Sequence, residues 1–110
     1  MGNNKLVGDL GEEFATKLLR LKGYEILETK YYCKLGEIDI IAKKENELFF
    51  IEVKTRQSLA MGSPAESVTS QKRERIRRVA RYYIYTEKVE YEKCSFQVIE
   101  VLTNHIENAF

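Results

Sequence analysis

This chain of 110 residues has little of what marks a secreted or membrane protein. Its two cysteines, Cys33 and Cys94, stand alone without a CxxC spacing, which favours reduced thiols and a cytoplasmic location. There is no apolar run long enough to cross a membrane and no signal-peptide pattern at the N-terminus. The single histidine, His105, lies in the C-terminal tail, and we assign it no catalytic role.

The net charge of the chain does not indicate a binding partner. The formal net charge is +1, and the composition, 44% hydrophobic and 32% charged, is that of an ordinary globular protein. The length suggests one domain, residues 1–110, because a chain of this size builds one modest core and not two. Any functional signal must therefore come from how the charges are distributed along the chain.

The centre of the chain predicts a β-hairpin. Residues 36–41 and 48–56 are rich in β-branched and aromatic residues, and the polar stretch 43–47 separates them, with Glu45 and Asn46 expected at the tip. Side chains alternate along a strand, so the charges are expected on one face and a purely apolar core face on the other. The first face would carry Glu37, Asp39, Ile41, Phe50, Glu52, Lys54 and Arg56, and the second Ile38, Ile40, Ala42, Phe49, Ile51 and Val53.

This register sets Asp39 against Glu52 and Glu37 against Lys54. Two ionised carboxylates on side chains about 4.5–5.5 Å apart at Cβ repel by roughly 3–4 kcal/mol at an effective dielectric of about 20. A bound cation, a protonated carboxyl or neighbouring cations would relieve this repulsion. Two interpretations stay open: a hard ion, Mg²⁺ or Mn²⁺, held by oxygen ligands, or a surface ion-pair ladder through Lys54 and Arg56.

The N-terminal segment, from about Asn4 to Lys22, has the periodicity of a helix. An adjoining flank of small residues suggests that this helix approaches a sheet closely. Glu13 falls on the polar side, where Lys17 explains it as an i,i+4 partner, whereas Glu12 lies at the edge of the buried side without such a partner. Glu12 is therefore either a solvent-facing border residue or part of a site. The apolar stripe comprises Leu6, Val7, Leu10, Phe14, Leu18 and Leu21, and the flank Gly8, Gly11, Ala15 and Leu19.

A second helix is expected from a cap at Thr69 or Ser70 to about Thr86. Its apolar stripe is Ile76, Val79, Ala80, Tyr83 and Ile84. Residues 72–81 hold six basic residues against one acid: Lys72, Arg73, Arg75, Arg77, Arg78 and Arg81 against Glu74. Such an excess suggests a polyanion partner, most often nucleic-acid phosphate, with a solvated face as the alternative.

Further strands are expected at Tyr24–Tyr32 and Phe96–Leu102. The loop at residues 57–64 suits either a substrate contact or a plain connector. The predicted order is α-β-β-β-α-β, an α/β fold with a mixed central sheet flanked by helices.

Several motifs occur in the chain in the order that is typical of a known family. They are Gly8-x-x-Gly11-Glu12-x-x-Ala15, Gly36-Glu37-Ile38-Asp39-Ile40-Ile41, Phe50-Ile51-Glu52-Val53-Lys54-Thr55-Arg56 and Gly62-x-Pro64, followed by Val68, Lys72, Ala80 and Tyr83. The chain resembles the YraN-like family of predicted endonucleases, within the resolvase-like branch of the PD-(D/E)XK superfamily, from Gly8 to about Val101. A bare ExK triplet is a weak signal, but the full ordered set is specific.

The resemblance implies a restriction-endonuclease-like core with one or two Mg²⁺ or Mn²⁺ ions. Glu12, Asp39, Glu52 and the carbonyl of Val53 would hold the metal, and Lys54 would be the catalytic lysine. The remaining site residues have supporting roles: Glu37 would pair with Lys54, while Arg56 and the basic residues Lys72, Arg73, Arg75, Arg77 and Arg78 would grip the nucleic-acid backbone. One departure is Gln97, which stands where the family commonly has Asp.

The expected activity is metal-dependent hydrolysis of DNA phosphodiester bonds, including branched or otherwise structured DNA. The alternative is a nucleic-acid-binding module whose nuclease site is weak or depends on a partner. Two further alternatives stay open. The chain could be a structural domain whose charges form only surface ion pairs, or its substrate could be RNA. A two-fold homodimer is a further expectation, because a chain this small grips few base pairs and two copies would cut both strands.

Overall fold

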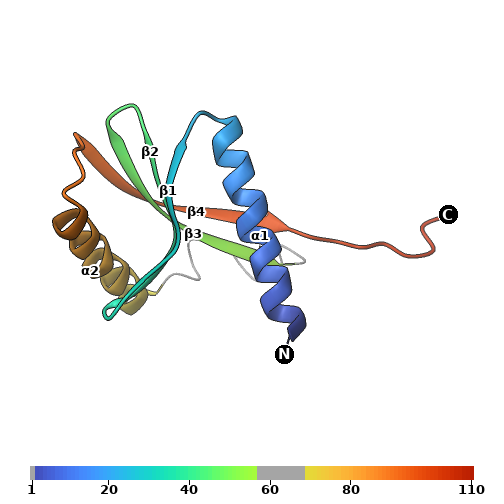
Figure 1. Cartoon of the computed structure of the whole chain (residues 1–110). Helices are drawn as coiled ribbons and strands as arrows, with labels where there is room; N and C mark the ends of the chain where they lie inside the picture. Colours follow the sequence, from blue (N-terminus) through green and yellow to red (C-terminus); the bar gives the residue numbers. More distant parts are fainter. Residues whose placement is uncertain (1, 57–68) are drawn as a thin grey trace.

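The computed structural model describes residues 2–56 and 69–110, so the predicted loop at 57–64 lies outside the described residues. The order of helices and strands is that predicted from the sequence, and it forms a mixed α/β architecture (Figure 1). The elements are α1 (Gly2–Leu21), β1 (Glu25–Cys33), β2 (Gly36–Lys44), β3 (Glu47–Arg56), α2 (Ser70–Glu87) and β4 (Lys93–Leu102).

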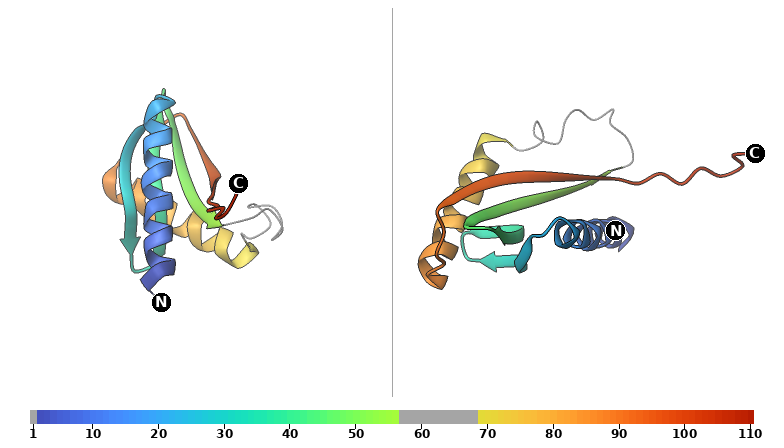
Figure 2. Two further views of the ribbon diagram at one scale, coloured as in Figure 1. Left: turned by 90° about the vertical axis from the view of Figure 1, so that its right-hand side faces the viewer. Right: turned by 90° about the horizontal axis from the view of Figure 1, so that it is seen from above.

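The four strands form one sheet in the order β1-β2-β3-β4. The first three are antiparallel neighbours, and β4 runs parallel to β3, so α2 belongs to the crossover between them. After β4 the chain continues as an extended tail, residues 103–110, which points away from the sheet (Figures 1 and 2).

The β2–β3 hairpin has the predicted tip, Glu45–Asn46, whose first residue adopts a positive φ of 53°. The ladder runs from Lys44 opposite Glu47 to Ile40 opposite Ile51, in the predicted register. The sequence therefore predicted the register of the hairpin correctly over this length.

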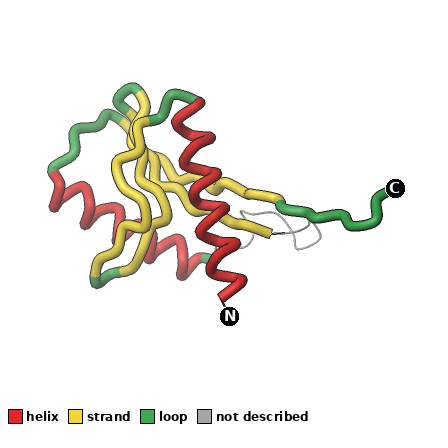
Figure 3. The backbone as a smooth tube through the Cα atoms, turned by 45° about the vertical axis from the view of Figure 1, so that its right-hand side comes forward, coloured by secondary structure: helices red, strands yellow, loops and turns green. Residues whose placement is uncertain are grey.

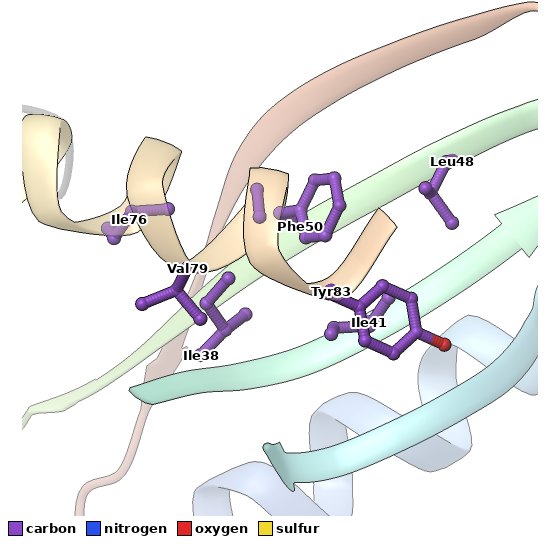
Figure 4. Close-up of a cluster of buried hydrophobic side chains, with 8 residues drawn as sticks. Ile38, Ile41, Leu48, Phe50, Ile76, Val79 and Tyr83 are labelled. Atoms are coloured by element: carbon purple, nitrogen blue, oxygen red, sulfur yellow. The ribbon is translucent and has the colours of Figure 1, made fainter. Parts of the chain in front are cut away.

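The two helices cover opposite faces of the sheet (Figures 2 and 3). The predicted division of the hairpin between two faces is confirmed for Ile41 and Phe50 on one side and for Ile40, Ala42, Phe49 and Ile51 on the other, but it is wrong for Ile38, which lies on the side of Ile41. Regular alternation thus fails near Asp39, since Ile38 and Ile41 share one face while Ile40 belongs to the other. The α2 side contains Ile38, Ile41, Leu48, Phe50, Ile76, Val79, Ala80 and Tyr83 (Figure 4), and the α1 side Ala15, Leu19, Ile40, Ala42, Phe49 and Ile51.

Helix α2 begins where the sequence indicated. The Thr69 hydroxyl accepts a hydrogen bond from the Lys72 backbone N–H at 3.2 Å and caps the first turn. At the other end, Lys88 adopts a left-handed conformation and its N–H donates to the Ile84 carbonyl. The predicted stripe is confirmed at Ile76 and Tyr83, both buried against the sheet.

Helix α1 turns a different side to the sheet than its larger apolar residues suggest. Leu10 is 65% exposed and Phe14 57% exposed, whereas Gly11, Ala15 and Leu19 on the small-residue flank are buried. A Cβ atom at Gly11 would lie 1.8 Å from the Thr55 hydroxyl oxygen of β3. The predicted close approach of the helix is therefore confirmed at Gly11, and small residues define the packed face.

This packing predicts opposite effects for two glycines of α1. Gly11→Ala introduces a methyl group into Thr55 and should lower the free energy of unfolding by about 1–3 kcal/mol. Gly8→Ala meets no atom within 4 Å and should raise it by up to about 1 kcal/mol through helix propensity. Urea unfolding followed by circular dichroism measures both, and equal effects of the two substitutions would contradict the close approach.

Candidate functional site

The pairing of strands β2 and β3 ends at Ile40 and Ile51, and beyond this pair the two strands diverge. From there β2 stays paired with β1, as at Ile38 opposite Tyr31, and β3 stays paired with β4, as at Glu52 opposite Val98. We call this point of divergence the strand fork, formed by Asp39 of β2 with Glu52 and Val53 of β3. Backbone groups at a fork lose their cross-strand partners, so side chains must supply the missing hydrogen bonds.

The two acids supply those bonds. The Val53 N–H donates to Asp39 Oδ2 at 2.8 Å, and the Asp39 N–H lies 3.4 Å from Glu52 Oε1, which accepts it. The sequence correctly predicted that Asp39 and Glu52 meet. The predicted ladder pairing of Asp39 with Glu52, and of Glu37 with Lys54, is wrong, because the regular register ends at Ile40.

Both acids are held where ionisation is costly. Burial raises the pKa of the Asp39 carboxyl above its ordinary value of 3.8, and the nearby charge of Glu37 adds to this, against the opposing Val53 hydrogen bond. Glu52 is only 8% exposed, and burial followed by the charge of Asp39 raises its pKa above 4.5. Paired carboxyls with raised pKa values are a recurring property of functional sites.

Two lysines accompany the acids. Lys72 Nζ, from the first turn of α2, lies 3.6 Å from Glu52 Oε2. The neighbouring Lys72 is also the main cause that lowers the pKa of the Lys54 amine, with burial second. Among the described residues, the ion pairs do not include one between Lys54 and Glu37. The strand fork thus combines two acids with two lysines, and the pKa of one of them, Lys54, is lowered.

Lys72 was predicted only as a backbone-binding residue, and its place beside Glu52 was missed. The sequence places Lys72 in the first turn of a helix, but it does not indicate that this turn lies over the end of β3. That position depends on how α2 packs against the sheet. We find no sequence signal that would have revealed it.

Glu12 is engaged elsewhere in this structure. Lys30 of β1 places its Nζ 2.9 Å from Glu12 Oε2 and 2.9 Å from Asp9 Oδ1. These bonds, first to Asp9 and then to Glu12, raise the pKa of the Lys30 ammonium. Glu12 Oε1 is buried and has no hydrogen-bond partner within the described part of the chain. Sequence reasoning missed Lys30, whose backbone has a left-handed φ of 51° inside a strand.

The donor chemistry of the strand fork fits a hard divalent ion. Asp39 and Glu52 offer carboxylate oxygens alone, and Mg²⁺ often uses one or two carboxylates and keeps several water ligands. Within residues 2–56 and 69–110, there is no group of three or more His, Cys, Asp or Glu side chains placed to share one ion. The two acids of the fork are therefore the residues that could hold a metal, with Glu12 available only if it leaves Lys30.

Two adjoining grooves meet at Glu52. The first, about 360 Å³, contains the fork acids and is lined by Tyr32, Gly36, Glu37, Asp39, Glu52, Lys72, Arg75 and Ile76. The second, about 280 Å³, lies between α2 and β4 and is lined by Phe50, Glu52, Arg73, Ile76, Arg77, Phe96, Gln97 and Val98. We call these the fork groove and the β4 groove. Four of the predicted backbone-binding residues, Lys72, Arg73, Arg75 and Arg77, line one groove or the other.

The other two basic residues are engaged in ion pairs. Arg78 lies 3.6 Å from Glu74 on the exposed side of α2. Arg56 pairs with Glu100 of β4, and both side chains are largely buried. Gln97 stands opposite Ile51 in the β3–β4 register and lines the β4 groove. None of these three side chains lines the fork groove, so any contact with a ligand there would require a rearrangement.

Fold and site together define a small α/β protein with a mixed four-stranded sheet. Where its central strands diverge, the sheet carries Lys54, the half-buried Asp39 and the buried Glu52, and Lys72 of α2 lies beside them. The chain belongs to the family described as "Uncharacterised protein family UPF0102", whose profile matches residues 11–101. Neither helix in the described ranges is long and apolar enough to span a membrane.

Relatives within this family match along almost their whole length. A UPF0102 protein of Clostridioides difficile (strain 630) is 49% identical over 113 residues, which cover 98% of this chain and 99% of that protein. One from Caldicellulosiruptor saccharolyticus is 45% identical, over 93% of this chain and 86% of that protein. One from Caldanaerobacter subterraneus is 42% identical, over 98% and 97%.

The raised pKa of Asp39 predicts that Asp39→Asn stabilises the protein at neutral pH. Between pH 3.8 and the raised value the folded state binds more protons than the unfolded state, so stability falls as pH rises through this window. The asparagine keeps an acceptor for Val53 without the charge. The melting temperature in EDTA should rise by about 2–5 °C at pH 7, and the difference should vanish below pH 3.8.

Glu13→Gln is the matched control, because Glu13 is exposed and its ion pair within the described part of the chain is with Lys17. It should leave the melting temperature nearly unchanged at every pH. A lower melting temperature for Asp39→Asn than for the wild type at pH 7 would show instead that the Asp39 charge stabilises the fold.

Proposed function

We propose that this protein is a divalent-metal-dependent endonuclease that hydrolyses DNA phosphodiester bonds. The observation that carries the proposal is the strand fork, where the half-buried Asp39 and the buried Glu52 meet beside Lys54 and Lys72. The motif resemblance to the PD-(D/E)XK superfamily supports the same conclusion, since its acids and lysine coincide with these residues.

The two acids of the strand fork provide a reason for metal binding. Their ionised forms are disfavoured by burial and by each other, so a cation between them would offset both penalties. When bound, Mg²⁺ or Mn²⁺ supplies Lewis-acid polarisation of the phosphate and lowers the pKa of water. Asp39, Glu52 and the Val53 carbonyl would hold the ion, and Glu12 would join them only after release from Lys30.

Lys54 is suited to act on the attacking water. A lowered pKa makes its neutral amine more accessible, so it would take the proton as the water oxygen bonds to phosphorus. The bond from phosphorus to the 3′-oxygen breaks, and that oxygen takes a proton from solvent water, which leaves a 5′-phosphate and a 3′-hydroxyl. Lys72 has two roles here: it lowers the pKa of Lys54 and places positive charge beside the phosphate.

The basic residues along the grooves would position the nucleic acid. Lys72 and Arg75 border the fork groove, and Arg73 and Arg77 border the β4 groove. Contacts of this kind go to phosphates and carry no sequence information, so binding should be tolerant of sequence and should weaken with salt. A homodimer that cuts both strands stays a prediction from the size of the chain.

A nucleic-acid-binding module with a weak or partner-dependent nuclease site is the second candidate. One observation favours it: Glu12 is bound to Lys30, and only two acids meet at the fork. A partner or substrate that released Glu12 would then be needed for full activity. The two candidates differ in whether the isolated chain cleaves DNA.

A cleavage assay tests the proposal. Single-stranded, duplex, flap and four-way-junction DNA are incubated with Mg²⁺ or Mn²⁺ and wild type, Asp39→Asn or Lys54→Ala. Each substitution should lower the cleavage rate at least about 100-fold, because it removes a metal ligand or the proton acceptor, while DNA binding in EDTA is retained.

Lys17→Ala and Glu13→Gln serve as charge-matched controls on the exposed side of α1. Both should cleave at the wild-type rate. Activity that survives both Asp39→Asn and Lys54→Ala would overturn the assignment of the site. Binding without cleavage under any divalent ion would favour the second candidate.

A further inference from the structure

The β4 groove contains an exposed aromatic ring beside the strand fork. Phe96 is 47% exposed, although the ring it stacks on, Phe50, is buried in the core. The two ring centroids are 5.5 Å apart with an interplanar angle of 27°, so the rings are stacked. One face of the Phe96 ring thus packs against Phe50, and the exposed part of the ring lines the groove as a flat apolar surface.

The opposite wall of the groove is cationic. Arg73 and Arg77 both line it from α2, and a spacing of four residues puts them on one side of the helix. Among the described residues, the ion pair of Arg77 is a long, exposed contact of 3.9 Å with Glu74. A groove with an aromatic floor and guanidinium groups on its wall matches the two parts of a nucleotide, a flat base and an anionic phosphate.

The groove is in register with the strand fork. Phe96 stands opposite Phe50 in the β3–β4 ladder, and Val98 stands opposite Glu52, two residues further along. Residues two apart on a strand share a face and are separated by about 6.6 Å. Phe96 is therefore the diagonal neighbour of the fork acid Glu52 across the ladder, about 7–8 Å away, which is within the reach of one nucleotide.

We propose that the β4 groove binds the base of an unpaired nucleotide adjacent to the phosphate at the strand fork. The inference rests on the proposed nuclease function and specifies its substrate class. The base stacks on Phe96, and Arg73 and Arg77 bind the neighbouring phosphate. Bases of an intact duplex are stacked on each other and cannot enter, so the substrate is single-stranded DNA or the unpaired arm of branched DNA.

Tryptophan fluorescence tests the stacking directly, because the chain contains no tryptophan. Phe96→Trp places a single indole in the groove, and Phe14→Trp places one on the outer side of α1, where Phe14 is 57% exposed. Each variant is titrated with a 12-nucleotide single strand of DNA, the same strand of RNA, and a 12-base-pair duplex, all in EDTA. The expected result is quenching at position 96 by the DNA single strand, weaker quenching by duplex, and none at position 14.

Phe96→Leu provides a second measurement that keeps the core apolar. It should weaken binding of the DNA single strand roughly 5- to 100-fold and leave duplex binding unchanged. The same strand with abasic sites should bind wild type and Phe96→Leu equally. Phe14→Leu is the matched control and should bind like wild type.

Each outcome separates the base site from the nuclease. Equal quenching by duplex and single strand, or unchanged affinity of Phe96→Leu, overturns the base site even if Asp39-dependent cleavage is found. Quenching restricted to position 96 without cleavage under any divalent ion supports the base site and contradicts the nuclease. Stronger quenching by the RNA strand than by the DNA strand overturns the assignment of the substrate to DNA.

Discussion

The hydrogen bond from the Val53 N–H to the Asp39 carboxylate joins two strands whose backbone pairing has just ended. Without an acceptor there, the fork would expose an unpaired donor in a largely buried place. The bond also fixes Asp39 against Glu52, although burial and like charge oppose their ionisation. The fold thus holds the two acids together through a structural hydrogen bond, at a place where burial opposes their ionisation.

The helices determine where this pair can act. Helix α1 packs through its small residues against the C-terminal end of β3, where Gly11 lies close to Thr55. The first turn of helix α2 places Lys72 beside Glu52. The same helix lines the fork groove with Arg75 and the β4 groove with Arg73 and Arg77. The sheet and α2 therefore form a continuous surface from Phe96 past Glu52 to the fork groove, and the proposed chemistry and the proposed base site are parts of that one surface.

Much of this fold could be predicted from the sequence because its signals are local. The hairpin tip at Glu45–Asn46, the Thr69 cap and the apolar stripe of α2 follow from turn chemistry, capping and periodicity. The divergence of the strands could not be predicted, because pairing of β2 with β1 and of β3 with β4 is a property of the whole sheet. For the same reason, the Lys30 contact with Glu12 was not foreseen, whereas the meeting of Asp39 and Glu52 was.

Metal binding by the strand fork is the central claim, and calorimetric titration with Mn²⁺ in the absence of nucleic acid tests it most directly. The account predicts that wild type binds the ion, that Asp39→Asn weakens binding at least about tenfold by removing one carboxylate ligand, and that Glu13→Gln leaves it unchanged. Because burial raises the pKa of both acids, binding should release protons at mildly acidic pH. Equal Mn²⁺ affinity of wild type and Asp39→Asn would contradict the account.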